Sequence, residues 1–523
     1  MRRPRLAAAG LVLSLLVPAV AAAQEALPPE GTVRLTARDG GFVVEGALLG
    51  HDGAFYRVET EGGPVTVDAA RVDCDGACPG DPDLARIAIS GDAGAAGDLM
   101  PALARAYAAL NGMEVSAGDG SFALLEGGRE VLAISLRGNG TEEGFADLLA
   151  GEADMVLARR PVRPLEAALA RDAGLGNLAD PQRSLALAPG ALAVVVGRES
   201  PLRALTLPQL AAVFAGVLGD WSELGTGGEG AVRLHLPGEE DAAAQGFVDA
   251  VMEPAGLPLA EGGILRHADE ADLAAAVAAD PNAIGVVSAD AVGDARALAL
   301  GGGCAPPSRP SPFAVASGDY PLALPLLLYR PARRLPDAAR DFMIWLGTPG
   351  AAEAARAAGF GPESDPVPFG AQADRLAAGI AAADEGVLPA LREAVAALEG
   401  YERHPETFRF EDGSAQLDAA GETAARRLAG RLRAGEFDGR RLLFAGFSDA
   451  PGEADARLSR LRAGVVRDHV VDLAGGPAGA TLRAAGFGAA LPVACPDTVW
   501  GRNANRRVEL WVEEARPEAA RGG

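Results

Sequence analysis

Short apolar segments alternate with helical segments from Ile87 to about Gly361, and this alternation limits the fold more than any other feature of the chain. The segments "IAIS" and "EVLAISL" have the length of strands, and "ALAVVVG" is a continuous apolar run typical of a buried strand. The stretch "TLPQLAAVFAG" begins with Thr206 and Gln209 in a capping-box pattern, which indicates the start of a helix. The pattern predicts α/β sheets with helices on both faces, over a length sufficient for two lobes.

Composition excludes several classes of function. The chain has 523 residues and a net charge of -24, and all of its basic residues other than histidine are arginines. Its length predicts several domains. The acidity argues against nucleic-acid binding, which requires a basic surface. The absence of lysine excludes Schiff-base chemistry and a phosphate-binding P-loop lysine.

The N-terminal residues 1–23 resemble a secretory signal peptide. A basic segment, "MRRPR", precedes an apolar run, and Ala21-Ala22-Ala23 before Gln24 fits an A-x-A cleavage site near Ala23. The apolar run is shorter than the roughly 20 residues that a membrane helix needs. We therefore expect export to the periplasm without a transmembrane span, and without a lipid anchor because no cysteine stands at the cleavage site itself.

Residues 24–82 alternate apolar and polar side chains between Gly-rich turns, which predicts a small all-β module. Cys74 and Cys78 lie in the short loop "CDGACPG" of this module. In an oxidising compartment such a pair is expected to form a disulfide, and a metal site is the less favoured alternative because the histidines are scattered. Whether Cys304 and Cys495 pair with each other stays open.

Two further segments follow the alternating region. Residues 363–403 have helical spacing interrupted near Gly386 and Pro389, and they are expected to form a helical connector. Residues 404–515 form a final α/β segment that ends in the strand "RVELWVE". The whole chain is therefore predicted to be an α/β multidomain protein.

Three loops of the alternating region, 91–98, 138–144 and 238–246, each lead into a predicted helix. The start of a helix exposes free backbone N–H groups and the positive end of the helix dipole. Such junctions bind oxyanions without lysine, although every α/β fold contains some of them.

The order of these segments resembles the PstS-type phosphate-binding proteins of ABC transporters, over residues 85–362. The resemblance implies a two-lobed periplasmic-binding-protein fold of type II that closes on a phosphate-like anion. Matched to the family's loops, the anion-binding residues are Gly91, Asp92, Asn139, Gly140 and Thr141.

The match to this family is incomplete at two loops. Gly91-Asp92-Ala93-Gly94 replaces the family's Gly-Ser-Gly-Thr, and Asp241-Ala242-Ala243 replaces its Ser-Gly-Thr. A hydrogen bond to a charged group contributes about 1.5–3 kcal/mol, so the loss of two hydroxyl donors is expected to weaken phosphate binding about a hundred- to ten-thousand-fold. We therefore expect the fold to be kept and the affinity for phosphate to be low, with Asp92 left to accept a proton from a monobasic ligand.

The C-terminal segments "FRFEDGSAQLDAAGETAARRL", "LLFAGFSDAPGEADARLSRLRAG" and "GRNANRRVELWV" resemble the OmpA-like domain in the order of its motifs. That family implies an α/β sandwich that binds peptidoglycan without cleaving it. Matched to its motif, Asp449 holds the ammonium of the diaminopimelate stem peptide, Arg462 holds its carboxylate, and Arg506 supports them.

Two positions depart from the OmpA-like motif. The turn after Asp449 is about two residues shorter than usual, and Asp455 stands where the family has an asparagine. An acid at this position either repels the ligand carboxylate or orients Arg462. Without the motif, the pair of Asp449 and Arg462 would be an ordinary surface pair that contributes about 0–1 kcal/mol.

Taken together, these features predict a non-enzymatic protein with no cofactor or metal, associated with the cell wall or outer membrane. One domain binds peptidoglycan, and the other binds a phosphate-like anion or another solute. The alternative is a cell-wall-anchored scaffold whose cleft has lost its ligand and mediates protein contacts. A hydrolase is the weakest interpretation, because the sequence has no GxSxG motif, metal-ligand cluster or Cys–His pairing.

Overall fold

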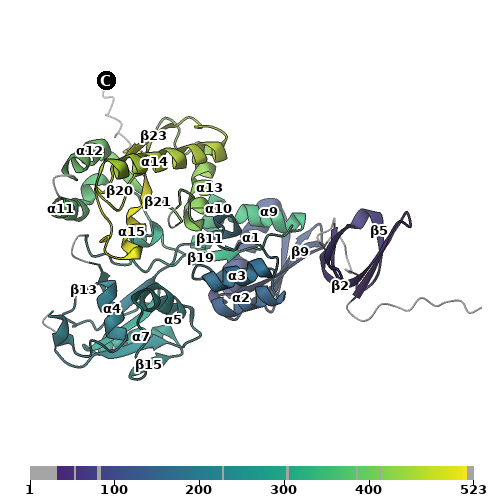
Figure 1. The fold of residues 1–523 in the computed structure, drawn as a ribbon, viewed down its shortest axis with the longest axis horizontal. Coiled ribbons are helices and arrows are strands. Elements are labelled where there is room, and N and C mark those ends of the chain that lie inside the picture. The colour runs from purple at the N-terminus through teal and green to yellow at the C-terminus, as the bar shows by residue number, and fades with distance from the viewer. Residues whose placement is uncertain are drawn as a thin grey trace, which may run out of the picture. The chain divides into compact units, whose positions relative to one another are not determined.

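The computed structural model describes residues 32–51, 55–78, 84–225, 229–301, 305–383, 387–411 and 414–514. The chain separates into two compact units, Met1–Pro82 and Asp83–Gly523, whose elements are labelled in Figure 1. The predicted signal peptide, residues 1–23, and Cys304 lie outside the described residues.

The first unit is an antiparallel sheet with the strand order β4-β3-β2-β1-β5. Its strands alternate buried and exposed side chains, and Val33, Leu35 and Val58 form the core on one face. Cys74 and Cys78 are joined by a disulfide, with their Cα atoms 6.0 Å apart. The elements are β1 (Thr32–Ala37), β2 (Val43–His51), β3 (Phe55–Thr60), β4 (Gly63–Asp68), η1 (Ala69–Arg71) and β5 (Val72–Gly76).

The second unit begins with a lobe, lobe I, built on a seven-stranded sheet of order β11-β19-β10-β6-β9-β8-β7. Helices α1, α9 and α10 pack on one face, and α2 and α3 pack on the other. The elements are β6 (Ala85–Gly91), η2 (Ala95–Leu99), α1 (Met100–Asn111), β7 (Glu114–Gly118), β8 (Ser121–Glu126), β9 (Arg129–Gly138), α2 (Thr141–Ala150), β10 (Met155–Ala158), α3 (Pro164–Asp172), η3 (Pro181–Arg183), β11 (Ser184–Ala188), β19 (Leu326–Tyr329), α9 (Asp337–Leu346) and α10 (Pro349–Ala357).

The chain then forms lobe II on a five-stranded sheet of order β15-β14-β16-β12-β17. Strand β12 is buried along its whole length, as its apolar sequence predicts. The elements are β12 (Leu192–Val196), β13 (Ala204–Leu205), α4 (Leu207–Phe214), η4 (Trp221–Leu224), β14 (Arg233–Pro237), α5 (Ala242–Phe247), η5 (Val248–Met252), α6 (Glu253–Ala255), β15 (Ile264–His267), α7 (Glu270–Ala279), β16 (Ala283–Ser288), β17 (Arg296–Ala297), β18 (Ala299–Leu300) and α8 (Pro312–Ala316).

Two chain segments cross between the lobes, and we call residues 188–192 and 322–326 the hinge. The two crossings run side by side, because the N–H of Leu324 donates to the carbonyl of Gly190 at 2.8 Å and the N–H of Leu192 donates to Leu322 at 2.9 Å. A paired hinge of this kind allows the lobes to open and close around a cleft.

The C-terminal part is a five-stranded sheet of order β20-β21-β24-β22-β23, with helices on both faces. Helices α13 and α14 bury one face, and α12 packs on the other around Phe447 and Trp511. The elements are β20 (Val367–Pro368), η6 (Phe369–Ala371), α11 (Ala373–Ala382), α12 (Leu388–Leu398), β21 (Tyr401–Arg409), α13 (Ala419–Arg433), β22 (Arg441–Gly446), α14 (Glu453–Ala474), β23 (Thr481–Gly486), α15 (Val499–Asn505) and β24 (Arg507–Glu513).

The segment expected to be a connector, residues 363–403, is integrated into this C-terminal part. It contains helices, as predicted, but Leu391 and Leu398 of α12 are buried against the sheet. Arg375 of α11 is also buried, and its guanidinium donates to both carboxylate oxygens of Glu509, at 2.6 and 3.3 Å. The segment therefore supplies one layer of the C-terminal core, a role that helical spacing alone does not reveal.

The C-terminal part contacts both lobes next to the hinge. On lobe I, Arg427 donates to the carbonyls of Ala186 and Leu187 at 2.9 and 3.0 Å. On lobe II, Asp319 accepts from Arg403 at 2.7 Å and from Arg409 at 2.9 Å. Helix α13 accordingly lies beside α10 and β11 (Figure 1). Movement at the hinge is therefore coupled to the C-terminal part.

Candidate functional site

The three loops singled out from the sequence meet where the two lobes face each other. Each leads into a helix as predicted, namely η2, α2 and α5. A Cβ atom placed on Gly140 would lie only 3.8 Å from the carbonyl oxygen of Glu240, and one on Gly138 would lie 2.8 Å from the Cα of Ala93. Loops of both lobes thus lie against each other, and we call the region between the lobes at these loops the cleft.

Asp92 is an internal anchor in this cleft. Its side chain is buried, and one carboxylate oxygen accepts from the N–H of Ala95 at 2.8 Å. The other oxygen accepts from Nε of Arg159 at 2.8 Å. Because both oxygens already have partners, Asp92 orients Arg159, and its predicted role as a direct ligand of the anion stays a prediction.

The second loop is held by hydrogen bonds of its own. The amide of Asn139 donates to Asp147 at 3.0 Å and accepts from Ser90 at 2.8 Å. The N–H of Gly140 donates to the carbonyl of Gly91 at 2.9 Å. Thr141 is buried, and its hydroxyl accepts from the N–H of Arg159 at 3.2 Å. Most of the donors predicted to bind an anion are therefore engaged within the protein.

Carboxylates occupy the positive ends of two cleft helices. A Cβ atom on Gly140 would lie 2.9 Å from a carboxylate oxygen of Glu143, which places this acid at the start of α2. Asp241 caps α5 by accepting from the N–H of Ala243 at 2.7 Å. Deeper in lobe II, burial raises the pKa of Glu270, and the nearby Asp241 acts in the same direction. These acids oppose the binding of a dianion.

Arg159 is the cleft's available cation. Its side chain is 28% exposed, and Nη1 lies 3.6 Å from the position of a Cβ atom on Gly190, at the hinge. Only its Nε is paired with a carboxylate among the described residues, so both Nη groups remain available to a ligand. Arg159 and Arg160 directly follow the buried strand β10, and this Arg-Arg pair is the sequence feature that indicates Arg159. The match of the loops to the PstS-type family does not include it.

Ion pairs also join the two lobes. Asp249 of lobe II accepts from Arg163 of lobe I at 2.5 Å, and its other oxygen lies 3.1 Å from Nε of Arg160. Arg160 is 2% exposed and forms a two-pronged pair with Glu166, at 2.7 and 2.9 Å. These ion pairs therefore hold lobe I and lobe II together at the cleft.

The C-terminal candidate residues gather where β22 ends and α14 begins. A Cβ atom on Gly446 would lie 2.1 Å from the carbonyl of Ser459, so the strand and the helix are in close backbone contact. Asp449 accepts from Nε and Nη2 of Arg506 at 2.8 and 3.0 Å. Burial by itself raises the pKa of Asp449, but the hydrogen bonds and charge of Arg506, a backbone hydrogen bond and the charge of Arg462 together lower it.

Arg462 is the other guanidinium of this cluster. It packs over the ring of Phe410 at 5.1 Å, and its Nε is buried without a hydrogen-bond partner. Burial, followed by the like charge of Arg506, lowers its pKa, while Asp449 and Asp455 act in the opposite direction. Asp449 therefore pairs with Arg506, the residue expected to support the site, and Arg462 forms no ion pair with a described residue; the ligand contacts of Asp449 and Arg462 stay a prediction.

A family model described as the PBP superfamily domain matches residues 81–348, which are 268 of the 523 residues.

The chain belongs to the PBP superfamily.

Several known proteins resemble this chain. Protein SphX of Synechococcus elongatus is 26% identical over 201 residues, which cover 36% of this chain and 57% of the relative. An ABC-type phosphate transport receptor from Vibrio cholerae has 19% identity and a TM-score of 0.42, covering 53% of this chain and all of that chain. A phosphate ABC transporter substrate-binding protein with bound phosphate from Clostridium perfringens has 18% identity and a TM-score of 0.39, with coverage of 53% and 100%.

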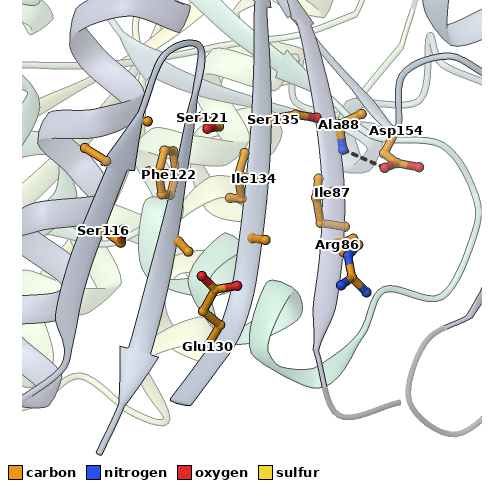
Figure 2. Close-up of a pocket in the computed structure, with 14 residues that line it drawn as sticks. Arg86, Ile87, Ala88, Ser116, Ser121, Phe122, Glu130, Ile134, Ser135 and Asp154 are labelled. Atoms are coloured by element: carbon orange, nitrogen blue, oxygen red, sulfur yellow. Dashed lines mark hydrogen bonds between the residues drawn. The ribbon is translucent and has the colours of Figure 1, made fainter. Parts of the chain in front are cut away.

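The family match confirms the predicted binding-protein-like domain. A separate hollow of about 480 Å³ lies on the sheet of this PBP-superfamily domain (Figure 2). Small side chains of β6, β7, β8 and β9 line most of it, and Asp154 at its edge accepts from the N–H of Ala88 at 2.7 Å. None of the predicted anion-binding residues is among the described residues that line it, so the interlobe cleft remains the candidate site of this domain.

Two further findings concern the described residues only. No helix among them is long and apolar enough to cross a membrane. They also contain no group of three or more histidine, cysteine or acidic side chains arranged to hold a metal ion. Cys495 is disulfide-bonded, while Cys304, its suggested partner, lies outside the described residues.

Proposed function

We propose that this chain is a non-enzymatic binding protein of the periplasm, attached to the cell wall or outer membrane through an OmpA-like domain at residues 404–515. That domain binds the diaminopimelate stem peptide of peptidoglycan. The PBP-superfamily domain binds a small anion, either phosphate held weakly or another solute.

One observation carries the peptidoglycan site: Arg462 is a half-buried guanidinium without an ion pair to any described residue. A cation in such a place is stabilised by an anionic partner, which the ligand's carboxylate supplies. The carboxylate of Asp449 lies in the same cluster. Its two oxygens offer about four acceptor sites, so the pair of bonds from Arg506 leaves room for an ammonium. An ammonium and a carboxylate on one side-chain end match this arrangement.

The test is co-sedimentation of the full chain with purified diaminopimelate-type peptidoglycan. We expect Arg462→Met to weaken binding roughly 10- to 150-fold, because a hydrogen bond to a charged group contributes about 1.5–3 kcal/mol. Asp449→Asn should weaken it similarly. Peptidoglycan that has lysine in place of diaminopimelate keeps the ammonium but lacks the carboxylate, so it should bind less well than the diaminopimelate form.

The matched control is Arg457→Met, which removes an exposed arginine from the same helix, α14. It should sediment like the wild type. If Arg462→Met and Asp449→Asn also sediment like the wild type, the assigned site is wrong.

For the cleft, we expect phosphate to bind with a dissociation constant weaker than about 1 μM, measured by titration calorimetry on the full chain. The reason is that Arg159 is the main available donor, whereas Glu143 and Asp241 add negative charge. Asp241→Ser keeps a helix cap and removes one charge. It should tighten phosphate binding roughly fivefold, on the order of 1 kcal/mol.

Asp269→Ser is the control for this charge change. Asp269 caps α7 in the same way, by accepting from Ala271 and Asp272 at 2.8 and 3.1 Å. This variant should leave phosphate binding unchanged. Sub-micromolar binding by the wild type would contradict the expected loss of phosphate-binding donors from these loops.

The interlobe ion pairs favour a second candidate function, a wall-anchored scaffold with an empty cleft. Arg160, Arg163 and Asp249 hold the lobes together without any ligand. Native mass spectrometry of the purified protein separates the two functions, because a retained small anion supports the binding protein and its absence supports the scaffold.

A further inference from the structure

A second cavity, of about 700 Å³, lies behind the hinge, where both lobes meet the C-terminal part. We call it the hinge cavity. It is lined by hinge residues such as Gly190 and Ala323, by α10, and by residues of β21, α13 and α15. Its volume is in the range of ordinary small-molecule sites. The cleft residue Arg159 and the peptidoglycan residues Asp449 and Arg462 are not part of its lining.

Most charges in the hinge cavity are already paired. Arg431 binds Glu406 and Glu436. Arg409 binds Asp319 at 2.9 Å. Asp418 caps α13 by accepting from the N–H of Gly421 at 2.7 Å. Burial lowers the pKa of His404, so its imidazole is neutral at neutral pH.

Two guanidiniums of the lining, and the carboxylate of the exposed Glu353 on α10, form no ion pair with a described residue. Arg427 uses Nη2 to hold the carbonyls of Ala186 and Leu187, but its Nε is buried without a partner. Burial lowers the pKa of Arg427 to about 10; the charge of Glu406 opposes this change and that of Arg356 adds to it. Arg356, which is exposed, lines the same cavity and forms no ion pair within the described residues. Two neighbouring cations repel each other, and an anion between them removes that repulsion.

The rest of the wall indicates the shape of such an anion. Val315 and Phe360 line the cavity together with several prolines, and its lining is more apolar than polar. The hydroxyl of Ser364, also in the lining, is buried without a partner. A ligand that fits this wall has one acidic group and an apolar body.

We propose that the hinge cavity is a second ligand site, for an amphipathic organic anion whose acidic head binds Arg427 and Arg356. Arg356 belongs to α10 of lobe I and Arg427 to α13 of the C-terminal part. The ligand therefore joins these two parts directly beside the hinge. This proposal does not depend on the cleft or on the peptidoglycan site.

The probe is 8-anilinonaphthalene-1-sulfonate, a fluorescent organic anion with an apolar body, titrated into the full chain at neutral pH and moderate salt. We expect one saturable site. Arg356→Gln should weaken it roughly tenfold or more, as expected for the loss of a charged hydrogen-bond partner. Arg427→Gln should do the same. Dodecanoate should displace the probe, whereas acetate and inorganic phosphate, which lack the apolar body, should not.

Arg356→Gln is the decisive variant, because no hydrogen bond of the Arg356 side chain to a described residue is present, while Arg427 also holds the backbone of β11. The matched control is Arg392→Gln, which removes an exposed arginine from α12. This control should bind the probe like the wild type. The proposal is overturned if Arg356→Gln binds like the wild type, if no saturable site is found, or if phosphate alone displaces the probe.

Discussion

Replacing Asp319 by Asn should lower the free energy of unfolding by about 3–5 kcal/mol, because it removes the acid that pairs with Arg409 and one of the two acids that pair with the buried Arg403. Burial by itself raises the pKa of Asp319, but Arg403 and Arg409 together lower it far below its ordinary value. A depressed folded-state pKa means that the stabilisation is fully present above about pH 4, the ordinary pKa of aspartate, and is lost as the pH falls further.

Urea unfolding of the full chain between pH 7 and pH 3 measures both effects. The wild type should lose stability below about pH 4 more steeply than Asp319→Asn, which lacks this titrating group. Asp341→Asn, in the exposed part of α9, is the control and should change stability by less than about 0.5 kcal/mol. Equal stability of Asp319→Asn and the wild type at pH 7 would mean that the contact between lobe II and the C-terminal part is not formed in solution.

Glu509→Gln should be at least as damaging, with a loss of about 3–5 kcal/mol or more. Glu509 is fully buried and accepts from Arg375 at 2.6 Å, from Arg507 at 2.7 Å and from the indole N–H of Trp511 at 3.0 Å. Burial by itself raises the pKa of Glu509, but the surrounding guanidiniums lower it to about 2. The amide of glutamine keeps the shape but leaves buried cations uncompensated.

Tryptophan fluorescence during urea unfolding measures this loss, since Trp511 contacts the substituted group. Glu393→Gln, exposed on α12, is the matched control and should behave like the wild type. The double variant with Asp319→Asn should lose more than the sum of the two single losses, because each single variant leaves Arg403 one of its two acids and the double variant leaves it neither. Full additivity would contradict a shared network.

Local structure in this protein follows from local sequence. The continuous apolar run of β12 is buried as predicted, and Thr206 and Gln209 form the expected capping box, with the N–H of Gln209 donating to the Thr206 hydroxyl at 3.3 Å. Each of these features is determined by the sequence of a segment of about ten residues. Hydrophobic periodicity and capping chemistry therefore suffice to predict them.

The sites depend on contacts that no local pattern contains. Asp92 binds Arg159 and Asp449 binds Arg506, partners separated by 67 and 57 residues in the chain. From the sequence, the candidate residues of the C-terminal cluster were found through their motif, but their pairing was not. The burial of residues 363–403 could not be predicted for the same reason. The hydrophobic spacing of a helix is the same whether the helix packs on a sheet or connects two domains.

The ion pairs across the cleft affect the kinetics of ligand entry. Arg160 is 2% exposed in the closed form, so opening the lobes exposes a charge pair that is otherwise shielded from water. Under the proposed binding function, these ion pairs are expected to disfavour an open state, and the apparent affinity of a ligand that enters through it is then reduced by the fraction of molecules that are open. Once lobe opening limits the rate, adding more ligand no longer speeds its uptake. Under the proposed binding function, we therefore expect a response to a sustained supply of solute rather than to a brief pulse.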